Sequence, residues 1–243
     1  MQDCGLVIPD TCMDIIFHVD HTENRINGSF CALDDRSSLT LNEEAGTAGT
    51  SVFAIRFYAW AAFLFTENSF SGSKNGRFSI DEFFPEIKKQ LEPLLFEAGS
   101  LTDKVHAAEK VLLKNIHTER SSPDLMNAVH YMISMNGKAK ISDLTSCTAV
   151  SERRLERLFD RYTGTSPKNL CGLIRYQMLW RDILFDSSFD PSDAVEKYGY
   201  FDQAHMLNDF RRRHMMNPKE AVSLAKKYAD VGFLQYKDLL SVL

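Results

Sequence analysis

The sequence has few cysteines, and their spacing fits neither a zinc module nor a disulfide framework. Five occur among 243 residues, an odd number, and no two form a Cys-x-x-Cys pair. They are Cys4, Cys12, Cys31, Cys147 and Cys171. Scattered thiols of this kind are usually reduced, as they are in the cytoplasm.

A long apolar run and a secretory leader are also missing. No stretch of about 18 apolar residues occurs, so the sequence predicts no membrane-spanning helix. The first residues lack the basic start and the apolar stretch of a signal peptide. We therefore expect a cytoplasmic protein without a membrane contact.

Motifs of catalysis and metal binding are scarce as well. No Gly-x-Ser-x-Gly is present, and no Lys-Ser/Thr follows Gly72 and Gly76 to complete a phosphate-binding loop. His18-x-x-His21 supplies half of a metal site, although a surface pair at a strand end is the simpler interpretation. With these motifs missing, we expect no enzyme, metal or cofactor. A small-molecule enzyme is a third interpretation, which requires a pocket of converging titratable groups that a sequence does not display.

What the sequence does contain is an uneven distribution of charge. The net charge is −5 at pH 7. Residues 121–243 hold 17 Lys+Arg and 15 Asp+Glu, whereas residues 1–120 hold 11 and 18. This asymmetry predicts an acidic N-terminal domain and a C-terminal domain with a mixed surface, and by itself it is weak support for nucleic-acid binding.

Short segments rich in β-branched and aromatic residues predict strands in the segment 1–60. Turn-forming residues such as Asn27–Gly28 separate them. The segments are Val7–Ile8, Met13–Val19, Ile26–Leu33 and Ser51–Tyr58. Ala59–Phe65 is suited to begin a helix, and Phe70–Phe78 is rich in loop-forming residues.

Residues 81–119 follow a helical pattern. Apolar residues recur at helical spacing in the second half of this segment, at Leu101, Val105, Ala108, Leu112 and Ile116. The simpler interpretation is a helix packed on its own domain. The alternative is a helix that forms a dimer, because an apolar stripe is equally suited to a partner.

The part of the chain after residue 122 is helical and repeats itself with a 51-residue offset. Ser122 is suited to cap a helix and Pro123 to begin it, which places a domain boundary near Arg120–Pro123. Matched positions keep their chemical roles, with Leu155 and Met206 as one of several apolar pairs. Such an offset indicates a duplicated supersecondary unit.

Each copy has the anatomy of a helix-turn-helix unit. In the first, Ile141–Cys147 predicts a short helix, and Ser151 caps a second helix over Glu152–Thr163. In the second, Ala194–Tyr198 and Gln203–His214 are the matching helices. A long helix from Pro167 to Phe185 links the copies.

We therefore predict an α+β protein with two domains. Residues 1–120 form a β-rich sensor or dimerisation domain with helices at its end. Residues 121–243 form an all-α DNA-binding domain with two helix-turn-helix units joined by a linker helix.

Two stretches of this region resemble the AraC/XylS family of transcription regulators. One runs from Gly199-Tyr200-Phe201-Asp202-Gln203-Ala204-His205 to Asp209-Phe210-Arg211-Arg212, and the other joins Ser151-Glu152-Arg153-Arg154-Leu155 with Thr163-Gly164-Thr165-Ser166-Pro167. The resemblance covers about residues 122–226. It implies a sequence-specific DNA-binding regulator whose two recognition helices face one side of DNA and enter successive major grooves.

The N-terminal part is more weakly similar to a small β-rich sensor domain of some family members. The run from Ile8-Pro9-Asp10 to Met13-Asp14-Ile15-Ile16-Phe17 carries this likeness. If the domain binds a small-molecule effector, aromatic residues of its strands are expected to line the pocket, namely Phe17, Phe53 and Phe57. The simpler interpretation places these residues in the core.

The exposed face of the first recognition helix predicts one group of DNA contacts. At about 100° per residue, Arg153 and Arg157 lie opposite the apolar side chains. Arginine matches guanine O6 and N7, although solvated Arg–Glu pairs are the alternative. The predicted contacts are Arg153, Arg154, Glu156 and Arg157.

The second recognition helix offers a different group of side chains. Its predicted contacts are Gln203, Ala204, His205, Asn208, Arg211 and Arg212. Asparagine and glutamine suit adenine, and Asn208 stands where the family often has arginine. For His205, a DNA contact and a plain surface position are equally plausible. Arg211 and Arg212 are expected to hold phosphate or to form salt bridges.

The expected partners are double-stranded DNA, RNA polymerase, a small-molecule effector at the N-terminal domain and a second copy of the chain. The alternative function is a ligand-sensing or protein-interaction module whose helix-turn-helix units no longer read DNA. The near-neutral C-terminal charge and the weak second recognition helix motivate this alternative. The dependence of duplex binding on salt distinguishes the two.

Overall fold

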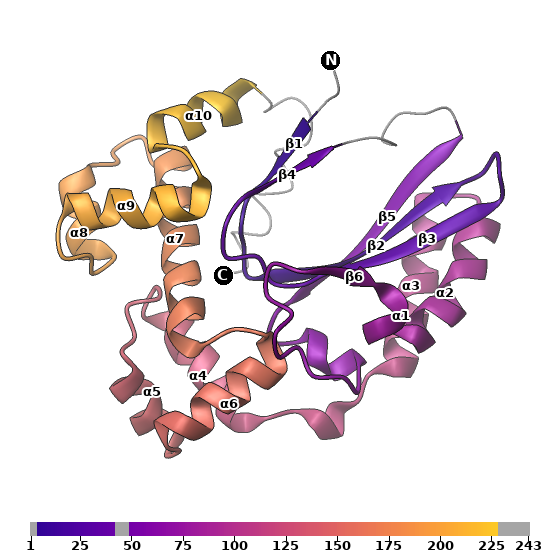
Figure 1. Ribbon diagram of the computed structural model, residues 1–243, viewed down its shortest axis with the longest axis horizontal. Helices are drawn as coiled ribbons and strands as arrows, with labels where there is room; N and C mark the ends of the chain where they lie inside the picture. Colours follow the sequence, from indigo (N-terminus) through magenta and orange to yellow (C-terminus); the bar gives the residue numbers. More distant parts are fainter. Residues whose placement is uncertain (1–3, 42–48, 228–243) are drawn as a thin grey trace.

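A four-stranded antiparallel sheet lies at the centre of the N-terminal region (Figure 1). In this computed structural model, which describes residues 4–41 and 49–227, the strands follow the order β5-β2-β3-β6. They are β2 (Cys12–Asp20), β3 (Arg25–Cys31), β5 (Thr50–Tyr58) and β6 (Arg77–Ser79). A separate pair is formed by β1 (Cys4–Val7) and β4 (Ser38–Leu41). Three of the four predicted strands correspond to β2, β3 and β5, whereas the predicted strand Val7–Ile8 shares only Val7 with β1, and β4 and β6 were not predicted.

Alternation along β2 explains which face of the sheet is buried. Successive side chains of a strand point to opposite faces. Those of Met13, Ile15, Phe17 and Val19 are buried, and the residues between them are half-exposed. Phe53 of β5 lies opposite Phe17 in the register and is also buried. Phe17, Phe53 and Phe57 therefore belong to the hydrophobic core, as the simpler interpretation predicted.

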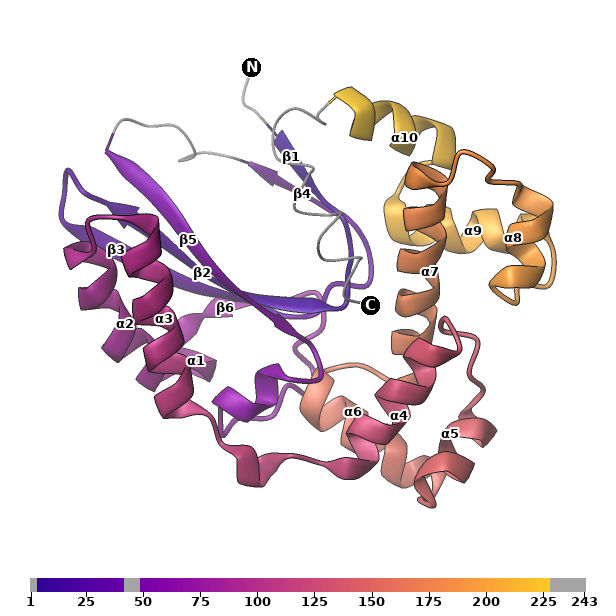
Figure 2. The same cartoon turned by 180° about the vertical axis from the view of Figure 1, so that it is seen from behind.

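The helices that follow the sheet lie against this region (Figure 2). They are α1 (Ile80–Phe83), α2 (Pro85–Glu97) and α3 (Leu101–Asn115), with the short 3-10 helices η1 (Ala62–Phe65) before and η2 (Thr118–Arg120) after them. The predicted helical segment over 81–119 is thus present but divided. Ser100 starts α3, because its side chain accepts a hydrogen bond from the backbone N–H of Asp103.

One face of α3 is covered and another is not. Ala108 and Val111 are buried where α3 packs against α2. Leu101, Val105 and Leu113 are exposed. The packing of α3 on its own region is therefore observed, and a role in a dimer stays a prediction.

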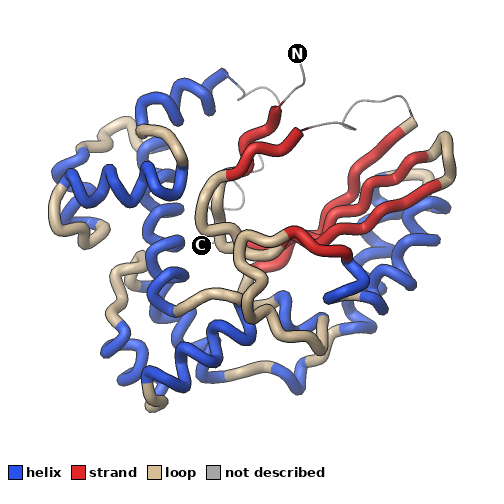
Figure 3. Tube along the Cα trace, viewed as in Figure 1, coloured by secondary structure: helices blue, strands red, loops and turns tan. Residues whose placement is uncertain are grey.

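From residue 123 to residue 227 the chain contains helices and no strands, as Figure 3 shows. They are α4 (Pro123–Ser134), α5 (Ile141–Thr148), α6 (Glu152–Thr163), α7 (Pro167–Phe185), α8 (Pro191–Lys197), α9 (Gln203–His214) and α10 (Pro218–Lys227). An antiparallel sheet region is thus followed by a helical region, which confirms the predicted α+β class.

The 51-residue offset reappears in the bounds of the helices. It carries both ends of α6 onto the ends of α9, and the side chains of Ser151 and Asp202 cap the two helices. Each helix ends at a left-handed residue, Gly164 with φ 66° and Met215 with φ 62°. The repeat is therefore structural, although its second copy ends without the glycine that this conformation favours.

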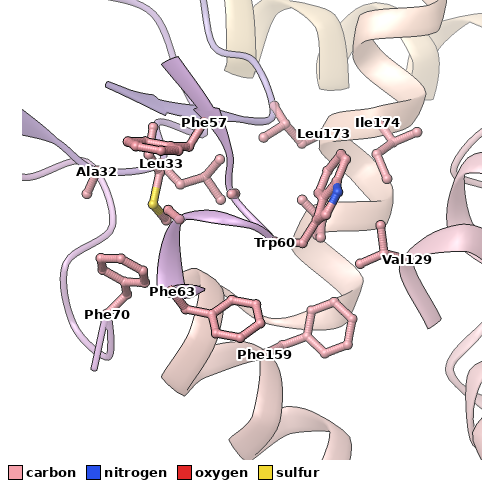
Figure 4. Close-up of a cluster of buried hydrophobic side chains, with 14 of the residues drawn as sticks. Ala32, Leu33, Phe57, Trp60, Phe63, Phe70, Val129, Phe159, Leu173 and Ile174 are labelled. Carbon is pink, nitrogen blue, oxygen red and sulfur yellow. The ribbon is translucent and has the colours of Figure 1, made fainter. Parts of the chain in front are cut away.

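The hydrophobic core continues from the sheet into the helical region. Figure 4 shows Trp60, from the segment after β5, pointing toward Leu173 of α7, and Phe63 of η1 pointing toward Phe159 of α6. The rings of Phe63 and Tyr162 are 4.5 Å apart. The two regions therefore pack on each other, and their separation into domains 1–120 and 121–243 stays a prediction.

None of the helices within the described ranges is both long and apolar enough to cross a membrane. Those ranges also bring together no group of three side chains suited to hold a metal ion. His21 Nε2 lies 3.1 Å from Ser51 Oγ, at the end of the sheet.

Candidate nucleic-acid interface

The first helix pair consists of α5 and α6. Ala149 adopts a left-handed conformation with φ 56°, which ends α5 and turns the chain toward α6. The Ser151 side chain then accepts a hydrogen bond from the Arg154 N–H, a local N-cap that begins α6. Leu155 and Phe159 are fully buried on one side of the helix.

The opposite side of α6 presents the predicted arginines. Arg153 and Arg157 are exposed, and neither forms an ion pair within the described parts of the chain. Glu156 between them is half-buried, and this burial, together with the charges of Glu152 and Asp160, raises the pKa of its carboxyl. This face therefore presents two guanidinium groups and, between them, one carboxyl group whose neutral form is favoured by partial burial and nearby negative charge.

Arg154 points elsewhere. Its Nη2 donates to Asp124 Oδ2 of α4 at 3.0 Å, and the side chain remains largely exposed. This ion pair joins α6 to α4 at the surface of the helical region. Arg154 therefore contacts its own domain here, a role that the sequence did not suggest because the partner lies on another helix.

The second helix pair consists of α8 and α9. Asp190 caps α8 by accepting from the N–H groups of Ser192 and Asp193. The α8 helix is held to α7 by Asp182, which accepts hydrogen bonds from the Lys197 ammonium at 2.6 Å and from the Tyr198 hydroxyl. Burial of Asp182 opposes ionisation, but these two hydrogen bonds outweigh it and lower the pKa.

The first two turns of α9 present four of its predicted contacts to solvent. Gln203, Ala204, His205 and Asn208 are all exposed. Gln203 Nε2 donates to Ser192 Oγ of α8 at 3.0 Å. His205 Nδ1 accepts from the Phe201 N–H at 3.3 Å, which orients its ring toward the turn. Gln203, His205 and Asn208 thus offer polar side chains, and Ala204 offers only a methyl group.

The three consecutive arginines in the last turn of α9 have different surroundings. Arg211 is exposed. Arg212 Nη2 donates to Asp209 Oδ1 at 2.6 Å, the salt-bridge alternative predicted for it. Arg213 is buried, with 2% of its surface exposed.

Sequence reasoning missed Arg213 and the carboxylate beside it. The buried Asp209 also accepts from the Tyr200 hydroxyl at 3.1 Å. Arg175 of α7 lies 4.3 Å from the centre of the Tyr200 ring. One signal was available, because the 51-residue offset places Arg213 where Tyr162 stands in the first copy, a charge in place of an aromatic residue.

The geometry of two capped helix pairs, each with one buried and one exposed polar face, is that of a helix-turn-helix protein. Residues 144–223 match the family model of a helix-turn-helix domain. This domain is of the AraC type, which confirms the resemblance found in the sequence and supports a DNA-binding transcription regulator.

Solved structures of two regulators are distantly similar. The xylose-binding transcription activator XylR shares 17% identity with a TM-score of 0.38, over 52% of this chain and 39% of its own. ToxT from Vibrio cholerae shares 11% identity with a TM-score of 0.44, over 91% of this chain and 93% of its own. A ToxT structure bound to an unsaturated fatty acid gives 10%, 0.44, and 91% of each chain. No curated protein sequence is significantly similar to the chain.

Proposed function

We propose that the chain binds double-stranded DNA in a sequence-dependent manner, with α6 and α9 entering successive major grooves. The observation that carries this proposal is the likeness of the two helices. They have the same length and the same capping scheme, they are related by the 51-residue offset, and both pack on α7. A linker helix that holds two recognition helices places their grooves about one turn, or about 34 Å, apart.

We further propose that residues 1–120 and 121–243 act as functionally distinct domains. The division falls between η2 and α4, where Ser122 caps a new helix through the Leu125 N–H. The first domain would regulate or dimerise, and the second would bind DNA. The hydrophobic core that the two regions share is compatible with this division, because one domain can regulate the other only if the two are in contact.

The two recognition helices are expected to read their half-sites unequally. Arg153 and Arg157 are exposed, four residues apart, and suited to guanine. Their counterparts, Ala204 and Asn208, offer a methyl group and an amide, so α9 is suited to a weaker preference for adenine. The half-site of α6 should therefore be the more sharply specified.

Arg153→Ala and Arg157→Ala should each relax the base preference at one or two base pairs of the α6 half-site. Loss of a bidentate contact to guanine removes about 1–3 kcal/mol of discrimination. Asn208→Ala should relax preference less. Arg211→Ala is the matched control, because loss of a phosphate contact weakens all sequences alike and lowers the salt slope by about one. The measurement is affinity for a site selected from random duplex and for its single-base variants, at one salt concentration.

If Arg153→Ala and Arg157→Ala both lose affinity by the same factor for every duplex, with each base preference intact, these arginines contact phosphate and not bases.

The alternative function is a helical module that no longer reads DNA. Ala204 and the half-buried Glu156 favour this alternative. A log affinity for random duplex that falls linearly with log salt supports DNA binding. A wild-type protein that binds no duplex at any salt concentration supports the alternative.

We also propose that α3 pairs with α3 of a second copy of the chain. Leu101, 71% exposed, and Val105 lie one turn apart on the side of α3 that α2 leaves open. Exposed apolar residues at this spacing are suited to a two-fold helix contact.

The double variant Leu101→Glu/Val105→Glu should be monomeric at a concentration where the wild-type chain is dimeric. Each copy would bring two carboxylates into the helix contact, where they are buried without partners, and this opposes association. Lys110→Glu changes the charge of an exposed residue on the far side of α3 and should leave the dimer intact. Sedimentation velocity measures the mass of each, and a monomeric wild-type chain at high micromolar concentration would disprove the contact.

A further inference from the structure

We propose that Arg213 is a positioning residue for α9, through which the loop between β3 and β4 sets the pose of the second recognition helix. The part of this loop formed by residues 34–37 is called the 34–37 loop below. The proposal rests on the proposed function, since it concerns the affinity of α9 for its half-site. The proposal adds that the affinity for the α9 half-site depends on one loop of the N-terminal region, whereas the affinity for the α6 half-site does not.

The guanidinium of Arg213 joins three segments that are distant in sequence. Its Nη1 donates to the Asp35 carbonyl oxygen at 3.3 Å, and its Nη2 donates to Asn169 Oδ1 of α7 at 3.4 Å. In return, the Ser37 N–H donates to the Arg213 carbonyl oxygen at 2.7 Å. The 34–37 loop therefore satisfies a carbonyl group in the last turn of α9, where a helix leaves its carbonyls without partners.

The 34–37 loop is itself anchored. The Asp35 N–H donates to Asn75 Oδ1 at 2.9 Å, and the Asp35 carboxylate accepts from Asn75 Nδ2 and Lys74 Nζ, each at 3.0 Å. Asn169 Nδ2 donates to the same carboxylate at 3.2 Å. Partial burial opposes ionisation of Asp35, but the hydrogen bonds from Asn75 and Lys74 lower the pKa. Asp35 is thus a charged acceptor at neutral pH that holds the loop against α7.

Arg213 depends on these partners because it is buried. Gly172 of α7 leaves room for it, since a Cβ there would lie 2.5 Å from Arg213 Nη2. Its other charged neighbour is Asp209, at 3.5 Å from its Nε. A buried charge that loses hydrogen-bond partners is costly, so α9 is expected to shift when the 34–37 loop moves.

A second set of contacts leads from Arg213 to the DNA-facing end of α9. Asp209 accepts a hydrogen bond from the Tyr200 hydroxyl, and the Arg175 guanidinium of α7 lies over the Tyr200 ring. Tyr200 precedes the N-cap Asp202 by two residues. The network therefore begins at the 34–37 loop and ends in the turn before Gln203 and Ala204.

The first recognition helix is held by a different loop, which provides the control. The Phe70 N–H donates to the Arg161 carbonyl oxygen at 2.9 Å, and the Ser71 hydroxyl donates to the Asp160 carboxylate. Tyr162, the counterpart of Arg213 by the offset, packs on Phe63 instead. Each recognition helix thus has its own contact with the N-terminal region near its C-terminal end.

The test measures the contribution of each half-site in Asp35→Ala, Arg213→Met and the control Ser71→Ala. Affinity is determined for the selected duplex and for two versions in which either half-site is scrambled. In Asp35→Ala and Arg213→Met, the loss caused by scrambling the α9 half-site should shrink by about tenfold, within the usual range of coupling between sites. The loss caused by scrambling the α6 half-site should stay as in wild type. Ser71→Ala should leave the α9 half-site contribution unchanged.

A purely structural role for Arg213 predicts a different result. Partial unfolding lowers the active fraction and weakens both half-sites by the same factor, whereas a positioning role changes their ratio. If Arg213→Met does not fold, Asp35→Ala decides, because it removes only loop anchors. If a folded Asp35→Ala weakens the contributions of both half-sites to affinity equally, or weakens neither, the inference is overturned. A wild-type chain that binds no duplex would instead overturn the proposed function on which it rests.

Discussion

Trp180→Ala should lower the free energy of unfolding by about 3–5 kcal/mol, the range found for removal of a large buried aromatic side chain. Trp180 is 1% exposed in the middle of α7. Its ring lies 5.6 Å from that of Phe210 and 4.6 Å from that of His214, both of α9. Truncation therefore leaves a cavity between α7 and α9.

Chemical denaturation of the full chain measures this loss. Phe185→Ala, at the end of the same helix and 48% exposed, is the matched control and should cost under about 1 kcal/mol. Trp180→Phe should fall between the two, because it keeps most of the ring contacts. It also removes the indole N–H, which has no hydrogen-bond acceptor in the described residues. An unchanged unfolding midpoint for Trp180→Ala would mean that the linker does not hold α9.

The second large effect is a loss of stability as the pH falls from about 6.5 to about 4. His214 is fully buried, and burial lowers its pKa from 6.5 to about 4. Its Nδ1 lies 2.6 Å from the Tyr176 hydroxyl, and its ring stacks on Phe210. Between these pKa values the unfolded chain binds a proton that the folded chain does not, so acid favours unfolding by up to about 3 kcal/mol.

His214→Phe removes this titration and keeps an aromatic ring at the position. Its free energy of unfolding should therefore depend less on pH than that of the wild type between pH 6.5 and 4. The difference between the two proteins is the relevant quantity, since Asp35 and Asp182 also lose stabilising interactions on protonation, at lower pH. Parallel stability curves for the two proteins across this window would show that His214 is charged in the folded state.

The bounds of α6 and α9 were predictable because their signals are local. Ser151 and Asp202 each cap a helix by a hydrogen bond to an N–H three residues ahead. Such contacts form in almost any tertiary context, so residue type and spacing suffice. The exposure of Arg153 and Arg157 follows in the same way from the helical period.

Strand pairing was less predictable because its determinants are not local. The short strand β6 exists because Phe78 pairs with Phe30 of β3, which lies far from it in the sequence. A segment so short has no alternation of its own to mark it. The loop that contains it was identified, and the strand within it was not.

The sequence by itself determined the class of this protein, since caps, prolines and a 51-residue repeat specify two helix pairs and the helix between them. Only the tertiary structure decided which polar side chains of those helices remain free. Arg154 pairs with Asp124 of α4 and Arg213 is buried beside Asp35, whereas Arg212 pairs with Asp209, three residues earlier on its own helix. The physical reason is that a capping bond joins residues already adjacent along the helix, whereas the partners of Arg154 and Arg213 depend on which distant segment packs alongside. Neighbouring arginines with the same local pattern therefore have different partners.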